Sequence, residues 1–391
     1  MTVIVDTELV DRARALAPLI EAEAEACEAA GTLSEAVASA VGQAGLFATL
    51  VPHQLGGAEA DVATALAVFE ELARADGSAG WSIMANATTT CFAAIYTGDE
   101  AVAAIFGAGP GGVGAPSAGG AVLAGMLGPM GQAVRVDDGF EVSGHYQFAS
   151  GSGHSNWIGA GTTEMVDGEP AVSELGLPAM RVAFVPRDQV DFQGNWDVLG
   201  LRGTGSYDYE LDRVPVPEAF TFLLLEATKR RGGPTYDIGL FGLTAVGHAA
   251  FALGVGRRAL DEIVEVARAK QRLGAEPIAD QQLFQHDFAI HDAALRSARA
   301  YTYEAFVEAE TAARTDGAPS VVESQRMRQA TTYATRVAAD AARFAYTWAG
   351  SSALRNPSVI QRCFRDLSAG TQHLYVDNNT LTAYTQAVLA G

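Results

Sequence analysis

The spacing of apolar residues changes twice along the 391-residue chain, and this constrains the fold more than any other feature. From Val10 to about Phe106, apolar residues recur at the spacing of helices, as in VATALAVFEELARA. From about Gly119 to Phe222, short runs such as RVAFVPRDQVDF alternate apolar with polar residues between Asp-Gly, Ser-Gly and proline signals, which is typical of strands. Helical spacing returns from Tyr236 in long, alanine-rich segments. The sequence therefore predicts helices, then an antiparallel sheet, then a helical bundle, in the α+β class.

Glycine and proline mark the breaks between these regions. The segment GAGPGGVGAPSAGGAV, residues 107–122, cannot hold a helix. Within the first region, VPHQLGGAEAD separates two helices, and either Gly57 or Asp61 is placed to start the second one. We expect three domains, which are an N-terminal α-helical domain over residues 1–118, a central β domain over residues 119–222 and a C-terminal helical bundle over residues 223–391.

Charge and cysteine content exclude several classes of protein. The net charge of −20, with no basic stripe, disfavours nucleic acid and membrane partners. Cys27, Cys91 and Cys363 lack C-x-x-C spacing, so neither a disulfide framework nor a thiolate zinc site is indicated. No histidine pair has metal-ligand spacing, and neither a signal peptide nor a membrane-spanning stretch is visible. We expect a cytoplasmic protein without a metal site.

The segment HYQFASGSGHSNW, residues 145–157, gathers histidines, serines, glycines and aromatic rings. Small residues let the backbone approach a flat ligand closely. On its own, the segment is equally consistent with a polar hairpin loop.

Four segments in order carry a resemblance to a known family: EELARADGSAGWSIM (70–84), GQAVRVDDGFEVSGHYQFASGSGHSNW (131–157), WDVLGLRGTGSYDYELDRVPVPEAF (196–220) and QRCFRDLSAGTQH (361–373). With the order of helical, β and helical regions, they resemble the acyl-CoA-dehydrogenase-like flavin-dependent monooxygenases, which are oxygenase components of two-component systems. The resemblance spans nearly the whole chain. It implies the acyl-CoA dehydrogenase fold.

The resemblance also implies an activity. Such an enzyme receives reduced FMN or FAD from a separate NAD(P)H:flavin reductase and reacts it with O₂. A C4a-(hydro)peroxyflavin then hydroxylates or oxidises a small organic substrate, which can be aromatic or contain a heteroatom. The family's habit of completing the flavin site across subunits implies a homotetramer.

In the resemblance, Phe148, Ala149, Ser150 and Gly151 run along the isoalloxazine ring of the flavin, with backbone N–H groups near its reactive edge. Ser150 is then a candidate catalytic residue that donates to the flavin or to the oxygen bound on it. Trp81 lies on the helix beside the flavin, although a plain core tryptophan is an equal alternative.

The catalytic base of an acyl-CoA dehydrogenase is missing from the sequence. That enzyme needs a glutamate facing the flavin, but neither residues 238–260 nor residues 367–391 contain one. His373 occupies the second region, where an imidazole with a pKa near neutrality can act as general acid or base. The alternative is a structural histidine.

Further site residues follow from the same resemblance. Candidate flavin contacts in GLRGTGS are Arg202, Thr204 and Ser206, and candidate contacts to flavin phosphates across the subunit boundary are Lys270, Arg272 and Gln282. Candidate substrate contacts are His154, Trp157 and Thr89, whereas His248 is interpreted as a core residue near the substrate entrance.

Two other functions stay open at this point. Some phenol hydroxylases of the family carry a histidine where this chain has Thr88, Thr89 and Thr90, which puts a phenolic substrate in doubt. An acyl-CoA dehydrogenase with a relocated base, or a flavin-binding protein without catalysis, would share most of these motifs.

Overall fold

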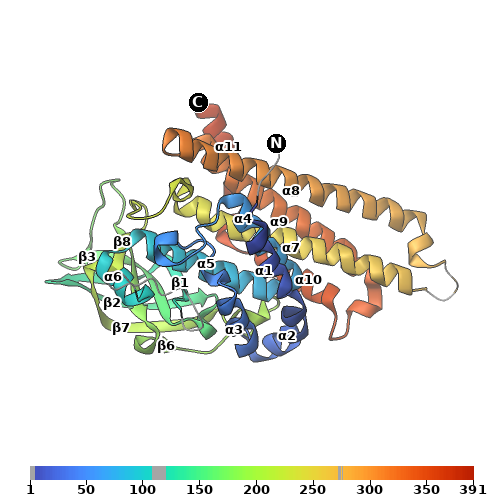
Figure 1. The fold of residues 1–391 in the computed structure, drawn as a ribbon, viewed down its shortest axis with the longest axis horizontal. Helices are drawn as coiled ribbons and strands as arrows, with labels where there is room; N and C mark the ends of the chain where they lie inside the picture. The colour runs from blue at the N-terminus through green and yellow to red at the C-terminus, as the bar shows by residue number, and fades with distance from the viewer. Residues whose placement is uncertain (1–4, 108–119, 272–273, 275) are drawn as a thin grey trace.

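The structure is a computed structural model that describes residues 5–107, 120–271, 274 and 276–391. Its first region is helical (Figure 1). The helices are α1 (Thr7–Ala15), α2 (Ala17–Ala30), α3 (Glu35–Gln43), α4 (Val62–Ala75), α5 (Gly77–Tyr96) and α6 (Asp99–Phe106). As predicted, Asp61 starts α4, because its carboxylate accepts a hydrogen bond from the Thr64 N–H.

The middle of the chain forms one sheet. Its strands are β1 (Leu123–Val136), β2 (Gly139–Ala149), β3 (Trp157–Val166), β4 (Glu169–Pro170), β5 (Met180–Pro186), β6 (Asp191–Phe192), β7 (Tyr207–Pro217) and β8 (Thr221–Leu223). They lie in the order β6-β7-β2-β1-β3-β5-β8, with β4 beside β3. The predicted boundary at residues 118–119 lies outside the described residues, so the domain limits stay a prediction.

The prediction of an antiparallel sheet is wrong for one pair of strands, because β1 and β3 run parallel. β2 turns back from β1 as a hairpin and takes the β7 side of it. β3 then reverses direction again and lies on the other side of β1. The sheet is therefore mixed.

The last region is helical again, as predicted. Its helices are α7 (Gly239–Ala269), α8 (Gln282–Asp316), α9 (Val321–Ala349), α10 (Val359–Gly370) and α11 (Asn379–Ala390). Residues Pro234–Ala269 are long and apolar enough to cross a membrane, with a mean hydropathy of 1.8 over the best window, but 78% of that window is buried inside the protein. This burial is typical of the core helix of a soluble bundle.

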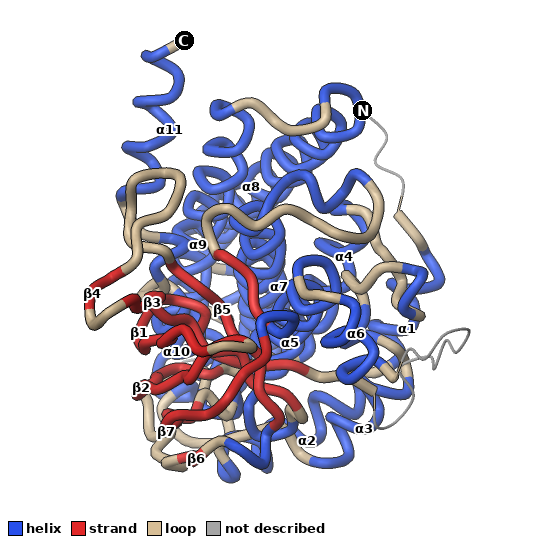
Figure 2. Tube along the Cα trace, turned by 90° about the vertical axis from the view of Figure 1, so that its left-hand side faces the viewer, coloured by secondary structure: helices blue, strands red, loops and turns tan. Residues whose placement is uncertain are grey.

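Helix α5 lies between the sheet and the long helices α7, α8 and α9 (Figures 1 and 2). All but one of its residues are buried. One apolar cluster joins the N-terminal helices to the bundle, and a smaller one, around Phe140, Tyr146 and Tyr209, fills the sheet region. Side chains that extend from α5 therefore meet both the sheet and α7.

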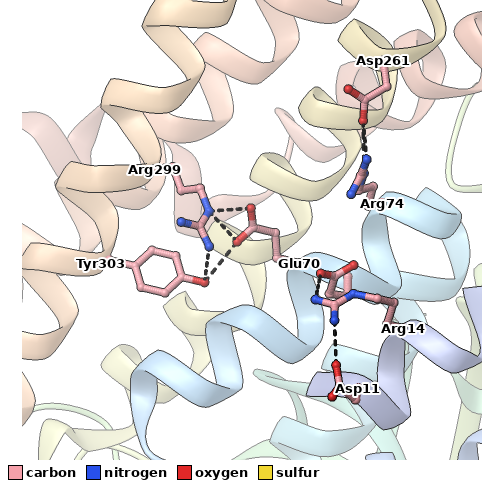
Figure 3. Close-up of polar contacts among 8 residues, drawn as sticks. Asp11, Arg14, Glu70, Arg74, Asp261, Arg299 and Tyr303 are labelled. Carbon is pink, nitrogen blue, oxygen red and sulfur yellow. Dashed lines mark hydrogen bonds and ion pairs between the residues drawn. The ribbon is translucent and has the colours of Figure 1, made fainter. Parts of the chain in front are cut away.

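Ion pairs connect the first and last regions at the surface (Figure 3). Arg299 of α8 contacts Glu70 of α4 at 2.7 Å, and Tyr303 donates a hydrogen bond to the same carboxylate. Arg74 of α4 pairs with Asp261 of α7 at 2.7 Å. These contacts fix α4 against the bundle and so help to position α5.

Candidate active site

A cavity of about 410 Å³ lies where α5, the sheet, α7 and the segment after α10 meet. Most of its lining is apolar, and among the described residues no aspartate or glutamate contributes to it. The polar side chains of the lining are Thr88, Thr89, Ser150, Thr244, His248, Arg328, His373 and Tyr375, together with the indole of Trp81. The predicted residues Trp81, Phe148, Ser150, His373 and Thr89 are thus brought to one cavity from distant parts of the sequence.

One wall of the cavity is formed by β1 and the end of β2, and we call it the β wall. Between Met126 and Gly131, β1 shifts its register against β3, so the segment 127–130 bulges outward. The Tyr209 hydroxyl fixes the base of this bulge, because it accepts a hydrogen bond from the Met126 N–H and donates to the Gly159 carbonyl. Leu127, Gly128 and Pro129 therefore face the cavity.

The end of β2 turns sharply at Phe148, whose φ of 66° is rare for a residue with a bulky side chain. The Ser150 N–H donates to the Phe148 carbonyl at 2.8 Å, and the Gly151 N–H donates to the Thr204 carbonyl at 2.8 Å. Of the backbone N–H groups expected near a flavin, those of Ser150 and Gly151 are thus already paired within the protein. The Ser150 hydroxyl is what this turn presents to the cavity.

A chain of hydroxyl groups runs inward from Ser150. Its Oγ accepts from Trp81 Nε1 at 3.0 Å and lies 2.8 Å from the Ser206 Oγ, which in turn lies 2.7 Å from the Thr204 Oγ1. The Thr204 hydroxyl donates its only hydrogen to the Leu201 carbonyl, so it must accept a hydrogen bond from Ser206. The Ser206 hydroxyl in turn accepts a hydrogen bond from Ser150. Ser150 is thereby left with an acceptor lone pair, not a donor, for the cavity.

The turn that carries Thr204 and Ser206 is fixed from outside the sheet. Leu201 adopts a φ of 58°, and its N–H donates to the buried Asp366 carboxylate at 2.6 Å. The Leu201 carbonyl also accepts from Trp196 Nε1 at 2.9 Å. Burial raises the pKa of Asp366 to about 8. The GLRGTGS segment therefore supports Ser150 from behind.

Two histidines lie together at the end of the cavity beside Trp81. The ring centroids of His248 and His373 are 4.2 Å apart. Burial lowers the pKa of His373 to about 4, and burial followed by the neighbouring His373 lowers the pKa of His248 well below its ordinary value. The expectation of a pKa near neutrality for His373 is therefore wrong, because the ring is buried.

The tautomer of His373 follows from its backbone contact. The Tyr375 N–H donates to His373 Nδ1 at 3.3 Å, so in the neutral ring the hydrogen lies on Nε2. His248 Nδ1 is buried and has no hydrogen-bond partner within the described residues. The pair is thus neutral, with an N–H donor on one ring and an unused nitrogen on the other.

The second wall, which we call the helical wall, comes from α7 and the segment after α10. Phe241, Thr244 and His248 recur at helical spacing and lie on one face of α7. Tyr375 packs against two rings of this wall, with ring centroids 6.1 Å from Phe241 and 5.4 Å from His248. This wall is held mainly by contacts between rings.

Two predicted substrate contacts lie elsewhere. His154 lines a separate cavity of about 460 Å³, and its Nε2 contacts the Asn86 Oδ1 at 2.8 Å. Burial lowers its pKa to about 4. Trp157 stacks on Phe220 at 5.8 Å and is absent from the cavity lining. His154 contacts the β wall only through Asn86, whose side chain also donates a hydrogen bond to the Leu123 carbonyl at the start of β1.

The remaining predicted flavin contacts are also distant within one protomer. Arg202 lies 3.9 Å from Asp197 at another surface hollow. Lys270 donates to the Ala349 carbonyl at 2.6 Å and to Ser352, and Gln282 is exposed at the start of α8. At 1.5 Å per helical residue, Lys270 is about 30 Å from His248 along α7. Arg272 lies outside the described residues.

Comparison with known proteins identifies the family. Residues 6–106 match the N-terminal domain of acyl-CoA dehydrogenases, and residues 246–378 match their C-terminal domain. The chain is 34% identical over 343 residues to indole-3-acetate monooxygenase of Pseudomonas putida, a match that covers 86% of this chain and 82% of the relative. The chain belongs to the acyl-CoA-dehydrogenase-like flavin-dependent monooxygenases. The predicted family and fold are confirmed.

One further relative agrees with that assignment, and one solved structure agrees with the fold. This chain is 26% identical over 378 residues to the oxygenase subunit HsaA of a flavin-dependent monooxygenase from Rhodococcus jostii, a match that covers 93% of both chains. The structure of XiaF from Streptomyces sp. in complex with FADH₂ and glycerol superimposes with a TM-score of 0.86, at 23% identity over 98% of this chain and 96% of that one. The last comparison supports the fold.

The cavity of this monooxygenase fits the head of a flavin. A flavin ring is flat, with one apolar and one polar edge. The cavity lining combines apolar side chains, such as Leu127 and Phe92, with the polar groups of Ser150, His248 and His373. The unpartnered Nδ1 of His248 leaves one of these groups open to a ligand. Ser150 and the bulge of β1 would therefore hold the ring, and the histidines would lie at its polar edge.

Several residues of the cavity were missed or undervalued from the sequence. The periodicity of GLFGLTAVGHAA places Phe241 and Thr244 on the same helix face as His248, so this group was within reach of sequence reasoning. Arg328 and the β1 bulge had no such signal. Arg328 is an arginine among several on α9, and its sequence context does not distinguish it. The bulge depends on how β1 pairs with β3, which the local sequence does not show.

Proposed function

We propose that this protein is the oxygenase component of a two-component system that transfers one oxygen atom from O₂ to a small aromatic substrate. Reduced flavin and O₂ are consumed, and hydroxylated or oxidised product, oxidised flavin and water are formed. The observation that carries this proposal is the lining of the cavity, which joins Ser150 to two neutral histidines and contains no carboxylate.

The chain's residues divide the work between the two walls. The β wall holds reduced FMN or FAD, since the Ser150 hydroxyl keeps an acceptor lone pair for a ligand and the bulge of β1 lines the cavity beside it. When bound, the reduced flavin supplies the electrons that activate O₂. The helical wall places the substrate against Phe241 and Tyr375, and the apolar lining excludes water.

His373 moves the proton in this proposal. The Nε2–H of the neutral ring donates a hydrogen bond to an oxygen atom of the reacting groups in the cavity. It keeps its hydrogen as long as no negative charge lies beside it. Negative charge that develops beside the ring favours its charged form and raises its pKa. His373 can then release the Nε2 hydrogen to that oxygen while Nδ1, once the Tyr375 N–H turns away, takes up a proton in its place. Tyr375 keeps the ring in the required tautomer.

The substrate class and the partners rest on other observations. The aromatic walls and the name of the indole-3-acetate monooxygenase relative support an aromatic ring of the size of indole. The name of the HsaA relative, an oxygenase subunit, supports a separate NAD(P)H:flavin reductase. Exposed apolar residues on α8 and α11, including Leu283, Ile290 and Leu389, support a homotetramer. Three free, buried cysteines are consistent with the cytoplasm.

A single turnover tests the proposal without a reductase. Protein with photoreduced FMN, and in parallel with photoreduced FAD, is mixed with ¹⁸O₂ and either indole or indole-3-acetate. The expected result is product with one ¹⁸O atom, detected by mass spectrometry. Complete conversion of O₂ to hydrogen peroxide with both flavins, with no label in indole or indole-3-acetate, contradicts the proposal. Bleaching of bound oxidised flavin by an acyl-CoA without O₂ would instead support the dehydrogenase alternative, whose base the cavity lacks.

A further inference from the structure

Among the residues that the structure describes, Arg328 of α9 is the one arginine in the lining of the active-site cavity. Its Nε is buried and has no hydrogen-bond partner among the described residues, and its guanidinium lies 5.6 Å from the Phe241 ring centroid. A guanidinium stays charged, and leaving its buried donor unpaired costs free energy. An arginine in this state is prepared for an anionic ligand.

Other arginines of the same region have acidic partners. Arg326, two residues earlier on α9, contacts Glu308 at 2.6 Å. Arg299 has both Glu70 and Tyr303 (Figure 3). The chain has 46 acidic residues against 26 lysines and arginines, so acidic partners are in excess. The missing partner of Arg328 is therefore a local feature of the cavity.

We propose that Arg328 determines substrate specificity by binding the carboxylate of an aromatic acid, whose ring lies along the helical wall. This inference rests on the proposed function, because it names the substrate class of the same site. One planar guanidinium matches one carboxylate through two parallel hydrogen bonds. The cavity lining offers no second lysine or arginine, which a phosphate dianion would favour.

The spacing along α7 limits the size of the acid. Arg328 contacts Phe241, and His373 contacts His248. Phe241 and His248 are separated by two helical turns, or about 10 Å. A ligand that reaches from the guanidinium to the histidines therefore carries its carboxylate on a short chain at the far end of one or two fused rings. Phe241 and Tyr375 flank this path.

The position of Arg328 favours the substrate over the flavin as the source of the anion. Arg328 contacts the helical wall, where Phe241 lies, whereas the hydroxyl chain that the proposal assigns to the flavin is on the β wall. The phosphate of FMN is nevertheless an oxoanion of related chemistry. The experiment therefore needs one arm for each source.

The test measures binding under anaerobic conditions to protein loaded with reduced flavin. The probes are benzoate, phenylacetate and 3-phenylpropionate, each with its uncharged amide. We expect the wild type to bind at least one acid about ten- to a hundredfold more tightly than its amide. Arg328→Gln should remove this preference and leave the affinity for the amide unchanged. Arg326→Gln, which breaks the pair with Glu308, is the matched control and should keep the preference.

Three results would overturn the inference. They are no preference for any acid in the wild type, a preference that survives in Arg328→Gln, and a loss of FMN affinity in Arg328→Gln without loss of riboflavin affinity. The last would assign Arg328 to the flavin phosphate. Because no O₂ is present, these outcomes are independent of the ¹⁸O experiment, and either proposal can fail alone.

Discussion

The β wall of the cavity is held by hydrogen bonds, whereas the helical wall is held mainly by ring contacts. On the β wall, Ser150, Ser206 and Thr204 form a directed chain that ends on a backbone carbonyl. On the helical wall, Phe241 and Tyr375 pack at 6.1 Å, and Phe241 is 47% exposed. A hydrogen-bonded wall suits a ligand of fixed shape, and a wall held by ring contacts adapts to a variable one. This contrast supports a flavin on the first wall and a substrate on the second.

The largest effect is expected at His373, where the two walls meet. His373→Ala should lower product formation about 10²- to 10⁴-fold, the range for a lost general acid or base, while reduced flavin still binds. O₂ should then end as hydrogen peroxide. The measurement is the ratio of product to peroxide in a single turnover. His286→Ala, which removes an exposed histidine of α8, is the control. An unchanged ratio in a folded His373→Ala protein would remove this residue from the mechanism.

The pH dependence of stability tests whether the histidine pair is neutral. The pKa of His373 is lowered to about 4 in the folded protein, so between pH 6.5 and 4 the unfolded chain binds more protons. Stability from this group is present above pH 6.5 and is lost as the pH falls toward 4, by roughly 3 kcal/mol. Urea denaturation of His373→Gln should show a correspondingly weaker loss than the wild type. Parallel curves for the two proteins would show that the ring is not held neutral.

A smaller effect is expected behind the β wall. Ser206 is buried and does not line the cavity, so Ser206→Ala breaks the hydroxyl chain without removing a ligand contact. Affinity for reduced flavin should fall about two- to tenfold, because Ser150 loses its fixed orientation. Ser152→Ala is the matched control. The Ser152 hydroxyl, two residues after Ser150, is buried and donates to the Gly205 carbonyl, so it is not a member of the hydroxyl chain. Equal losses of flavin affinity in both variants would mean general loosening of the loop.

Much of the fold could be predicted from the sequence, because apolar spacing and capping act locally. Asp61 starts α4 as its position before an apolar run indicates. The direction of β3 could not be predicted, since it depends on which side of β1 the chain takes after Ala149. Strand pairing is a non-local choice, and the local pattern of β3 is the same for a parallel or an antiparallel neighbour.

In the candidate site, too, features set by local sequence could be predicted, and features set by contacts between distant segments could not. Ser150, Trp81 and His373 were found because they stand in continuous motifs, and the structure brings all three to one cavity. The environment of His373 could not be predicted, because its lowered pKa depends on burial among residues from several elements. Arg328 is distinguished only by the absence of a partner, which no sequence displays.

The assignment of flavin to the β wall and of substrate to the helical wall can be tested directly by anaerobic titration. Reduced flavin and then an aromatic substrate are titrated into the wild type, Ser150→Ala and Phe241→Ala. We predict that Ser150→Ala weakens flavin binding, because Trp81 Nε1 and Ser206 lose their shared partner. Phe241→Ala should leave flavin affinity unchanged and weaken substrate binding about two- to tenfold through the lost ring contact. Equal weakening of flavin binding by both substitutions would contradict the account, because one wall could then no longer be assigned to each ligand.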